Sequence, residues 1–321
     1  MKVDSTKIKH LSMLLLPVAA TLIPLFIKND YQLRILNISM VYMIVVMGLN
    51  FIAGLVGQMN LGSAGMYAAG AYTAALLATK FGISMWIGLI ASIFVGFLIG
   101  ICLGYPCLKL SGIYLALTTM AFGEIVRLFL NNTEFAGGAI GIMGIPKFQI
   151  GSFVFNTQQR MFYLMLVFVV VLTLFALRIV HSKWGRVLRA IKYSPDIVST
   201  AGVNIANMKV KAFTLSAIYI GIAGVLNVGM TGYTYPGDYN ADISVRFFMM
   251  LLVGGVGSVP GCLLGALAVT ILPEVLRFAE DYYLLVFYII VFIMARALPY
   301  GMVSLPKLFS KVFSKKVLER R

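Results

Sequence analysis

Residues 85–106 read MWIGLIASIFVGFLIGICLGYP, a run of 22 positions without one Asp, Glu, Lys or Arg. A helix needs about 20 predominantly apolar residues to cross the hydrocarbon core of a bilayer. A run of this length and composition therefore predicts a transmembrane helix.

Nine further apolar runs occur along the chain, near 11–27, 35–56, 61–79, 110–130, 161–178, 212–234, 243–257, 260–275 and 282–298. Of the 321 residues, 60% are hydrophobic and 12% are charged, and the mean hydropathy is +0.95. Soluble domains contain roughly 45–50% apolar and 25% charged residues. The expected fold class is all-α, a polytopic membrane helix bundle of about 8–10 transmembrane segments.

The net charge of +15 is concentrated in three basic blocks. Three lysines lie in 1–10, seven Lys or Arg lie between 178 and 211, and six lie in 307–321, together 16 of the 26 basic residues. Because Lys and Arg accumulate in cytoplasmic loops, all three blocks are expected inside the cell. Six crossings before the central block and four after it satisfy this requirement and make both termini cytoplasmic. Separation of the blocks by apolar runs argues against a nucleic-acid-binding face.

The organisation predicted from this map is one transmembrane domain at 11–304, between a cytoplasmic tail at 1–10 and a basic cytoplasmic tail at 305–321. No small-residue cleavage site follows the run at 11–27, so we expect a retained first span rather than a signal peptide.

The segment GGVGSVPG, residues 254–261, interrupts the apolar sequence of the last third. Glycine removes rigidity and proline removes a backbone donor, so continuous helix is not expected here. The helix-break candidates, which are also candidates to line a pathway, are Gly254, Gly255, Gly257 and Pro260. Two short helices or a re-entrant pair are expected. Merging 243–275 into one helix would leave nine crossings and put the Lys-rich tail outside, against the positive-inside rule.

Few polar side chains interrupt the apolar runs, and these are the pathway candidates from the sequence. Gln58 and Asn60 lie between the second and third runs, and Glu124 and Arg127 lie near the end of the fifth. Burying such groups in hydrocarbon is costly unless they face a bundle interior or a cavity. Glu124 and Arg127 are three residues apart, a spacing that predicts an ion pair near the outer interface. A hydrated helix end and a substrate contact both remain open.

Enzymatic patterns are missing from the sequence. No Ser/His/Asp grouping, metal-ligand spacing or paired-carboxylate site stands out, so no catalytic residue, metal or cofactor is expected. There is no G-x-x-x-x-G-K-[ST] sequence either. If ATP drives this protein, a partner subunit binds the ATP.

The central basic segment predicts two short helices separated by a break. Residues 184–192 place Val187, Leu188 and Ile191 on one apolar side of a helix. A second helix of about seven residues is expected to start at Ser194 as cap and to end at Gly202. Such a pair suits docking of a motor protein, and a solvated loop near anionic lipid is the alternative.

The stretch GRVLRAIKYSPDIVSTAGVNIANMKVKAFTLSAIYIGIAGVL, 185–226, resembles the cytoplasmic coupling region of permease subunits of branched-chain amino-acid ABC importers. Blocks at 48–77, 111–132, 137–146 and 251–277 are similar to the same family in the same order, so the resemblance covers about 45–300.

The resemblance implies a half-translocator in the bacterial plasma (inner) membrane, with ATP bound by partner subunits. Its expected partners are a second homologous permease, two cytoplasmic ATPases and an extracytoplasmic substrate-binding protein. Within a coupling region of about 181–210, the family motif assigns coupling to Gly185, Arg186, Arg189, Ala190, Asp196, Ala201 and Gly202. The chain departs from the family pattern at 192–195 and at Arg246.

Leucine, isoleucine and valine are the leading substrates that this resemblance implies, and urea or short amides are the alternative because related permeases carry them. A largely uncharged pathway is expected, since fixed charges would hold a zwitterion too tightly. An ion-coupled secondary transporter should show intramembrane carboxylates, of which Glu124 is the one mid-chain candidate. A membrane enzyme should show a cluster of His or Asp, which His10 and His181 do not supply.

Overall fold

The computed structural model describes residues 29–106, 112–276 and 282–297, with isolated positions at 21, 22, 24, 27, 110, 301 and 302. The tails expected at 1–10 and 305–321 lie outside the described residues, as does most of the span expected at 11–27. The predictions for those segments stay predictions.

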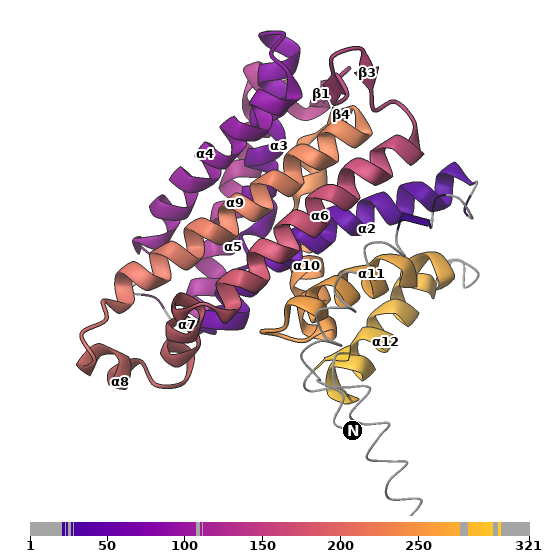
Figure 1. The fold of residues 1–321 in the computed structure, drawn as a ribbon. Coiled ribbons are helices and arrows are strands. Elements are labelled where there is room, and N and C mark those ends of the chain that lie inside the picture. The colour runs from indigo at the N-terminus through magenta and orange to yellow at the C-terminus, as the bar shows by residue number, and fades with distance from the viewer. Residues whose placement is uncertain are drawn as a thin grey trace, which may run out of the picture.

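Helices dominate the described chain and lie side by side as a bundle (Figure 1). The longer helices are α2 (Asp30–Leu49), α3 (Ser63–Lys80), α4 (Met85–Gly104), α5 (Gly112–Asn132), α6 (Gln158–His181), α9 (Ile205–Thr231), α10 (Ala241–Gly254), α11 (Val259–Val275) and α12 (Tyr283–Ala297). The shorter helical pieces are η1 (Asn50–Val56), η3 (Glu134–Ala136), η4 (Gly138–Ile140), α7 (Lys183–Tyr193), α8 (Pro195–Thr200) and η5 (Pro236–Tyr239). The strands are β1 (Ile142–Met143), β2 (Gln149–Ile150), β3 (Phe153–Val154) and β4 (Tyr233–Thr234).

Five described helices are long and apolar enough to cross a bilayer, with η1 counted as part of α2. They are Asp30–Val56, Met85–Gly104, Gly112–Asn132, Gln158–His181 and Ile205–Thr231. The helices α10, α11 and α12 have 14, 17 and 15 residues, fewer than the roughly 20 of a full span. The polytopic all-α bundle is confirmed, and the total of ten crossings stays a prediction.

Helix α9 is the centre of the bundle, packed against α2, α3 and α4. In α9 and α2, 83% of the apolar window is buried inside the protein, against 28% in α5 and α6. A helix that is apolar on all sides does not reveal its buried face in its sequence. The outward faces of α5 and α6 are suited to contact lipid or a partner helix.

Small residues allow α4 and α9 to pack closely. Gly96, Gly100 and Gly104 lie four residues apart on the face of α4 that meets α9. A Cβ added at Gly100 would lie 2.3 Å from the Cα of Thr214. Close backbone approach through small residues is a common way for helices to associate in membranes.

Between α2 and α3 the backbone leaves α-helical geometry within the bundle. Residues 50–56 form the π-helix η1, and residues 57–62 form the loop before α3. The N–H of Ala64 donates to Ser244 Oγ at 2.9 Å, and the N–H of Leu61 donates to Thr119 Oγ1 at 3.0 Å. Non-helical backbone at membrane depth requires such partners, since hydrocarbon offers none.

The glycine-rich segment after α10 forms the turn that its sequence predicts. Gly255 and Gly257 have φ values of +119° and +91°, in the region that favours glycine. A Cβ at Gly254 would lie 2.1 Å from the carbonyl oxygen of Gly261, so α10 and α11 pack backbone against backbone. Pro260 lies in the first turn of α11, where a missing N–H costs nothing. One merged helix over 243–275 is excluded.

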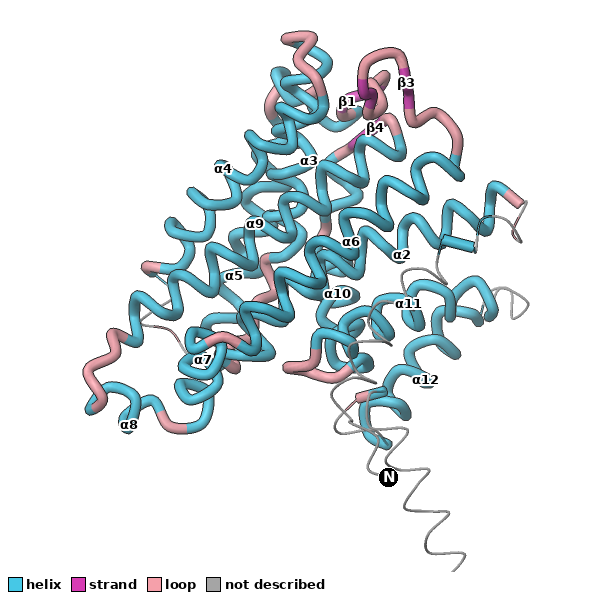
Figure 2. Tube along the Cα trace, viewed as in Figure 1, coloured by secondary structure: helices cyan, strands magenta, loops and turns pink. Residues whose placement is uncertain are grey.

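The bundle has two distinct ends (Figure 1). The antiparallel pairs β1–β4 and β2–β3 lie at one end, here named the hairpin end, and α7 and α8 lie at the other, the α7–α8 end. The connecting loops gather mostly at these two ends (Figure 2).

Candidate functional site

The helices α7 and α8 form a corner with one face against the bundle and one face exposed. Leu188 is fully buried and Ile191 is 4% exposed, while Val187 packs partly buried against the same core. Tyr193 and Ile197 are 79% and 70% exposed on the other side. The predicted apolar side of α7 is therefore confirmed, and large apolar side chains remain uncovered on the outside.

Three of the residues assigned to coupling fix the junction between α6 and α7. A Cβ at Gly185 would lie 2.4 Å from the carbonyl oxygen of Ile179, so a side chain there would displace backbone. Arg186 and Arg189 each donate a hydrogen bond to a carbonyl oxygen in the last turn of α6. Basic side chains commonly satisfy such C-terminal carbonyls, which have no partner within their own helix. These residues thus fix the direction of α7.

The other assigned residues lie on the exposed surface of the corner. Ala190, Asp196, Ala201 and Gly202 are all exposed. Gly202 has φ +79° with no atom within 4 Å of an added Cβ, so its predicted left-handed conformation is confirmed. Ser194 precedes α8 as expected, but its side chain accepts no capping hydrogen bond, and α8 has six residues.

Two hydrogen bonds that the sequence did not predict connect this corner with the helix breaks. The Nζ of Lys192 on α7 donates to the carbonyl oxygen of Gly54 in η1 at 3.3 Å. The Oδ1 of Asn50, also in η1, accepts from the N–H of Gly257 in the α10–α11 turn at 2.8 Å. The only sequence signal for Asn50 is its polarity within the apolar run 35–56. The corner, the π-helix and the glycine turn are thus in direct contact.

Gln58 and Asn60 lie in the buried loop between η1 and α3. Asn60 is fully buried, and its Oδ1 accepts from the N–H of Gly62 at 2.9 Å, which supports the start of α3. Gln58 is 8% exposed, and its Oε1 is buried without a hydrogen-bond partner in the described chain. Asn60 therefore has a structural role, while Gln58 keeps an unused acceptor inside the bundle.

Glu124 and Arg127 form the ion pair that their spacing predicts, on the half of α5 nearer the hairpin end. The Nε of Arg127 lies 3.0 Å from each carboxylate oxygen of Glu124. The side chains of Glu124 and Arg127 are 41% and 26% exposed, so the pair lies at the surface of α5 rather than in the core.

Among the described residues, no group of three or more His, Cys, Asp or Glu side chains is arranged to hold a metal ion. The geometry is that of a helical membrane protein with a surface corner mechanically connected to interior helix breaks.

A family model described as "Branched-chain amino acid transport system / permease component" matches residues 31–295. The high-affinity branched-chain amino acid transport system permease protein LivM of Salmonella typhimurium is 32% identical over 308 residues, covering 88% of this chain and 72% of that protein. LivM of Escherichia coli gives the same identity and coverage, 32%, 88% and 72%. BraD of Pseudomonas aeruginosa, a permease protein of the same kind of system, is 25% identical over 250 residues, 72% of this chain and 80% of its own. No solved structure matches the chain. This chain belongs to the family of permease components of branched-chain amino acid transport systems.

Proposed function

We propose that this chain is a transmembrane permease subunit of an ATP-driven importer of leucine, isoleucine and valine, and that it forms half of the translocation pathway. Its partners in this proposal are a second homologous permease, two cytoplasmic ATPases and an extracytoplasmic substrate-binding protein. Similarity to LivM and BraD, which are permeases of branched-chain amino acid systems by name, supports the substrate class.

The observation that carries the proposal is the corner of α7 and α8. Its inner side is anchored by Leu188 and Ile191, and its outer side exposes Tyr193 and Ile197. The segment from 178 to 211 also contains seven Lys or Arg, the largest number in any of the three basic blocks, which favours a cytoplasmic location. A rigid element of this kind can transmit the displacement of an ATPase docked on its outer face without bending.

The hydrogen bonds of Lys192 and Asn50 provide a route from that surface into the bundle. A displacement of α7 would be carried to η1 through Lys192 and to the α10–α11 turn through Asn50. A π-helix and a glycine turn are less constrained than continuous α-helix, so both are suited to change conformation. In this proposal, ATP binding on the partner subunits alters the helix breaks through this route.

The test is ATP-driven uptake of radiolabelled L-leucine by the complete transporter in proteoliposomes, with ATP hydrolysis measured in parallel. We expect Arg189→Glu and Gly202→Val to separate hydrolysis from uptake while the protein stays in the membrane. Matched controls lie at the hairpin end. Arg160→Glu also removes an arginine that bonds a carbonyl oxygen, and Gly151→Val also places a β-branched residue at a positive φ, +57°, in open space.

Normal coupled uptake by Arg189→Glu and Gly202→Val would refute the docking role of the corner. Leucine transport without ATP by the purified chain alone would refute the importer itself.

A further inference from the structure

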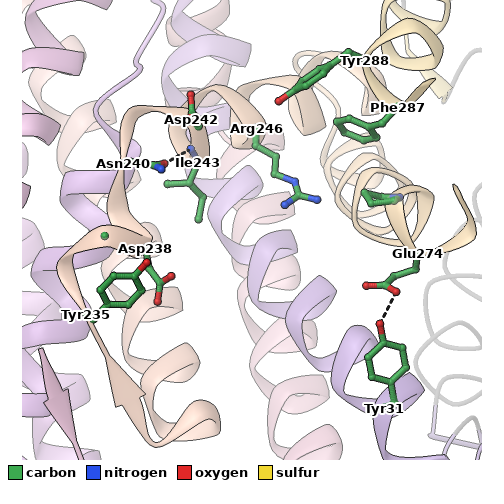
Figure 3. Close-up of a pocket in the computed structure, with 12 residues that line it drawn as sticks. Tyr31, Tyr235, Asp238, Asn240, Asp242, Ile243, Arg246, Glu274, Phe287 and Tyr288 are labelled. Carbon is green, nitrogen blue, oxygen red and sulfur yellow. Dashed lines mark hydrogen bonds between the residues drawn. The ribbon is translucent and has the colours of Figure 1, made fainter. Parts of the chain in front are cut away.

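A cavity of about 750 Å³ opens between η5, α10, α11, α12 and the start of α2 (Figure 3). It combines charged and aromatic side chains, and its lining includes Asp238, Asp242, Arg246, Glu274, Phe287 and Tyr288. Figure 3 shows Arg246 projecting into the space between Asp238 and Glu274. The cavity is separate from the corner described above.

Arg246 is the unusual member of this lining. It lies in the second turn of α10, and its Nε is buried without a hydrogen-bond partner. No ion pair or hydrogen bond joins its guanidinium to any residue that the structure describes, and the centroid of the Phe287 ring lies 5.9 Å from its Cζ. A cation inside a membrane protein is costly without a partner, so the unpaired Nε of Arg246 favours the binding of an anionic group in the cavity.

Two carboxylates of the cavity, those of Glu274 and Asp238, differ in their hydrogen bonds and exposure. Glu274 already accepts a hydrogen bond from the hydroxyl of Tyr31 at 2.5 Å. Asp238 is accessible from the cavity, yet partial burial raises the pKa of its carboxyl group. Asp238 and Arg246 line the same cavity but do not form an ion pair.

One kind of ligand matches this arrangement. A guanidinium binds a carboxylate through two parallel hydrogen bonds, and Asp238 is positioned to accept from an ammonium group. The rings of Phe287 and Tyr288 offer an apolar surface for an aliphatic side chain. Three carboxylates in the lining disfavour phosphate and other multivalent anions.

We propose that this cavity is a transit site for a free α-amino acid, in which Arg246 binds the carboxylate and Asp238 binds the ammonium group. The substrate class rests on the importer function proposed above. This charged site differs from the uncharged pathway expected from the sequence.

The first test compares transport with stability for the complete transporter. We expect Arg246→Gln to lower ATP-driven uptake of L-leucine roughly tenfold or more, because charge-assisted hydrogen bonds are lost. Arg246→Lys keeps the positive charge but lacks the planar guanidinium that binds a carboxylate through two hydrogen bonds, so it should retain intermediate uptake. The matched control is Arg34→Gln, an exposed arginine of α2 outside the cavity lining.

Stability distinguishes a binding role from a structural one. Removing an unpaired cation relieves its desolvation cost, so Arg246→Gln should melt in detergent at the same temperature as the wild type or higher. Wild-type uptake by Arg246→Gln would overturn the inference. A loss of uptake together with a lower melting temperature would also overturn it, because Arg246 would then be structural.

The second test measures binding without transport. Phenylglyoxal modification of the complete complex, mapped by peptide mass spectrometry, should be several-fold slower at Arg246 with L-leucine present, and unchanged with leucinol, which lacks the carboxylate. Arg160, exposed at the hairpin end, serves as the internal control. Failure of the reagent to reach Arg246, equal modification with leucine, or equal protection by inorganic phosphate would each count against an amino-acid site.

The two proposals fail in different ways. ATP-driven leucine uptake that is unaffected in Arg246→Gln keeps the importer function and removes the site. Protection of Arg246 by leucine in a complex without ATP-driven uptake keeps the site and removes the importer function.

Discussion

Replacing Asn50 with leucine should uncouple this transporter by breaking one hydrogen bond in its interior. Asn50 is 1% exposed, and its Oδ1 accepts from the N–H of Gly257 at 2.8 Å. Leucine has a similar size but no acceptor, so Asn50→Leu leaves that N–H without its partner. Gly54→Ala should also break this hydrogen bond, because the added Cβ would lie 2.0 Å from the present position of Asn50 Oδ1 and displace that oxygen.

The magnitude follows from the loss of one partly buried, neutral hydrogen bond. Leaving a donor unsatisfied costs about 1–3 kcal/mol, and a coupling energy of that size corresponds to about a 5- to 150-fold effect. The measured quantity is the number of leucine molecules imported per ATP hydrolysed in proteoliposomes. We expect this ratio to fall at least about fivefold while ATP hydrolysis continues.

The matched control is Asn37→Leu in α2, within the same membrane-spanning segment Asp30–Val56. Asn37 is also fully buried, and its Nδ2 donates to the carbonyl oxygen of Gln158 at 3.1 Å, away from the route through η1. Asn37→Leu should lower stability and leave the leucine-to-ATP ratio unchanged. If Asn37→Leu lowers the ratio as much as Asn50→Leu does, or if neither changes it, the proposed route through Asn50 is wrong.

Three further predictions concern the corner, the ion pair and the cavity. Gly185→Val should weaken copurification of the ATPases and lower the melting temperature, since its Cβ would lie 2.4 Å from the carbonyl oxygen of Ile179; unchanged copurification and melting would contradict this. Glu124→Gln and Arg127→Gln should each reduce the amount of protein in the membrane more than the double variant does, because a lone charge costs more than a neutral pair, and additive losses on immunoblots would exclude the pairing argument. Burial raises the pKa of Asp238 above its ordinary 3.8, so ionisation destabilises the folded state. The melting temperature of Asp238→Asn should therefore exceed that of the wild type, and this difference should grow as pH rises from about 3.8 through the elevated pKa. Below about pH 3.8 the difference should vanish. A constant difference across pH would contradict this.

Several features of the fold followed from local sequence. The run at 85–106 predicted α4 because an uncharged stretch of that length has few alternatives to a span. The segment GGVGSVPG predicted the separation of α10 from α11, since glycine and proline act on the backbone at their own positions. The corner of α7 and α8 was predicted because it is amphipathic, unlike the surrounding helices.

The candidate site could be predicted only in part from local sequence. Arg186 and Arg189 could be assigned to a corner, but their hydrogen bonds to the end of α6 required the turn to be seen. Arg246 stood out in the sequence only as a departure from the family pattern. Its significance comes from having no described ion-pair partner beside Asp238 and Glu274, which belong to other elements.

The amino-acid sequence alone determined that the chain is a helical membrane protein with basic blocks, short broken helices and a surface corner, because hydropathy, charge and backbone freedom are local properties. Only the tertiary structure decided which faces are buried, since the apolar residues of α2 and α9 are not confined to one face of either helix. It also decided that Asn50 reaches Gly257 across 207 positions. A hydrogen bond to a backbone N–H requires no particular residue at the other end, so the sequence carries no trace of it.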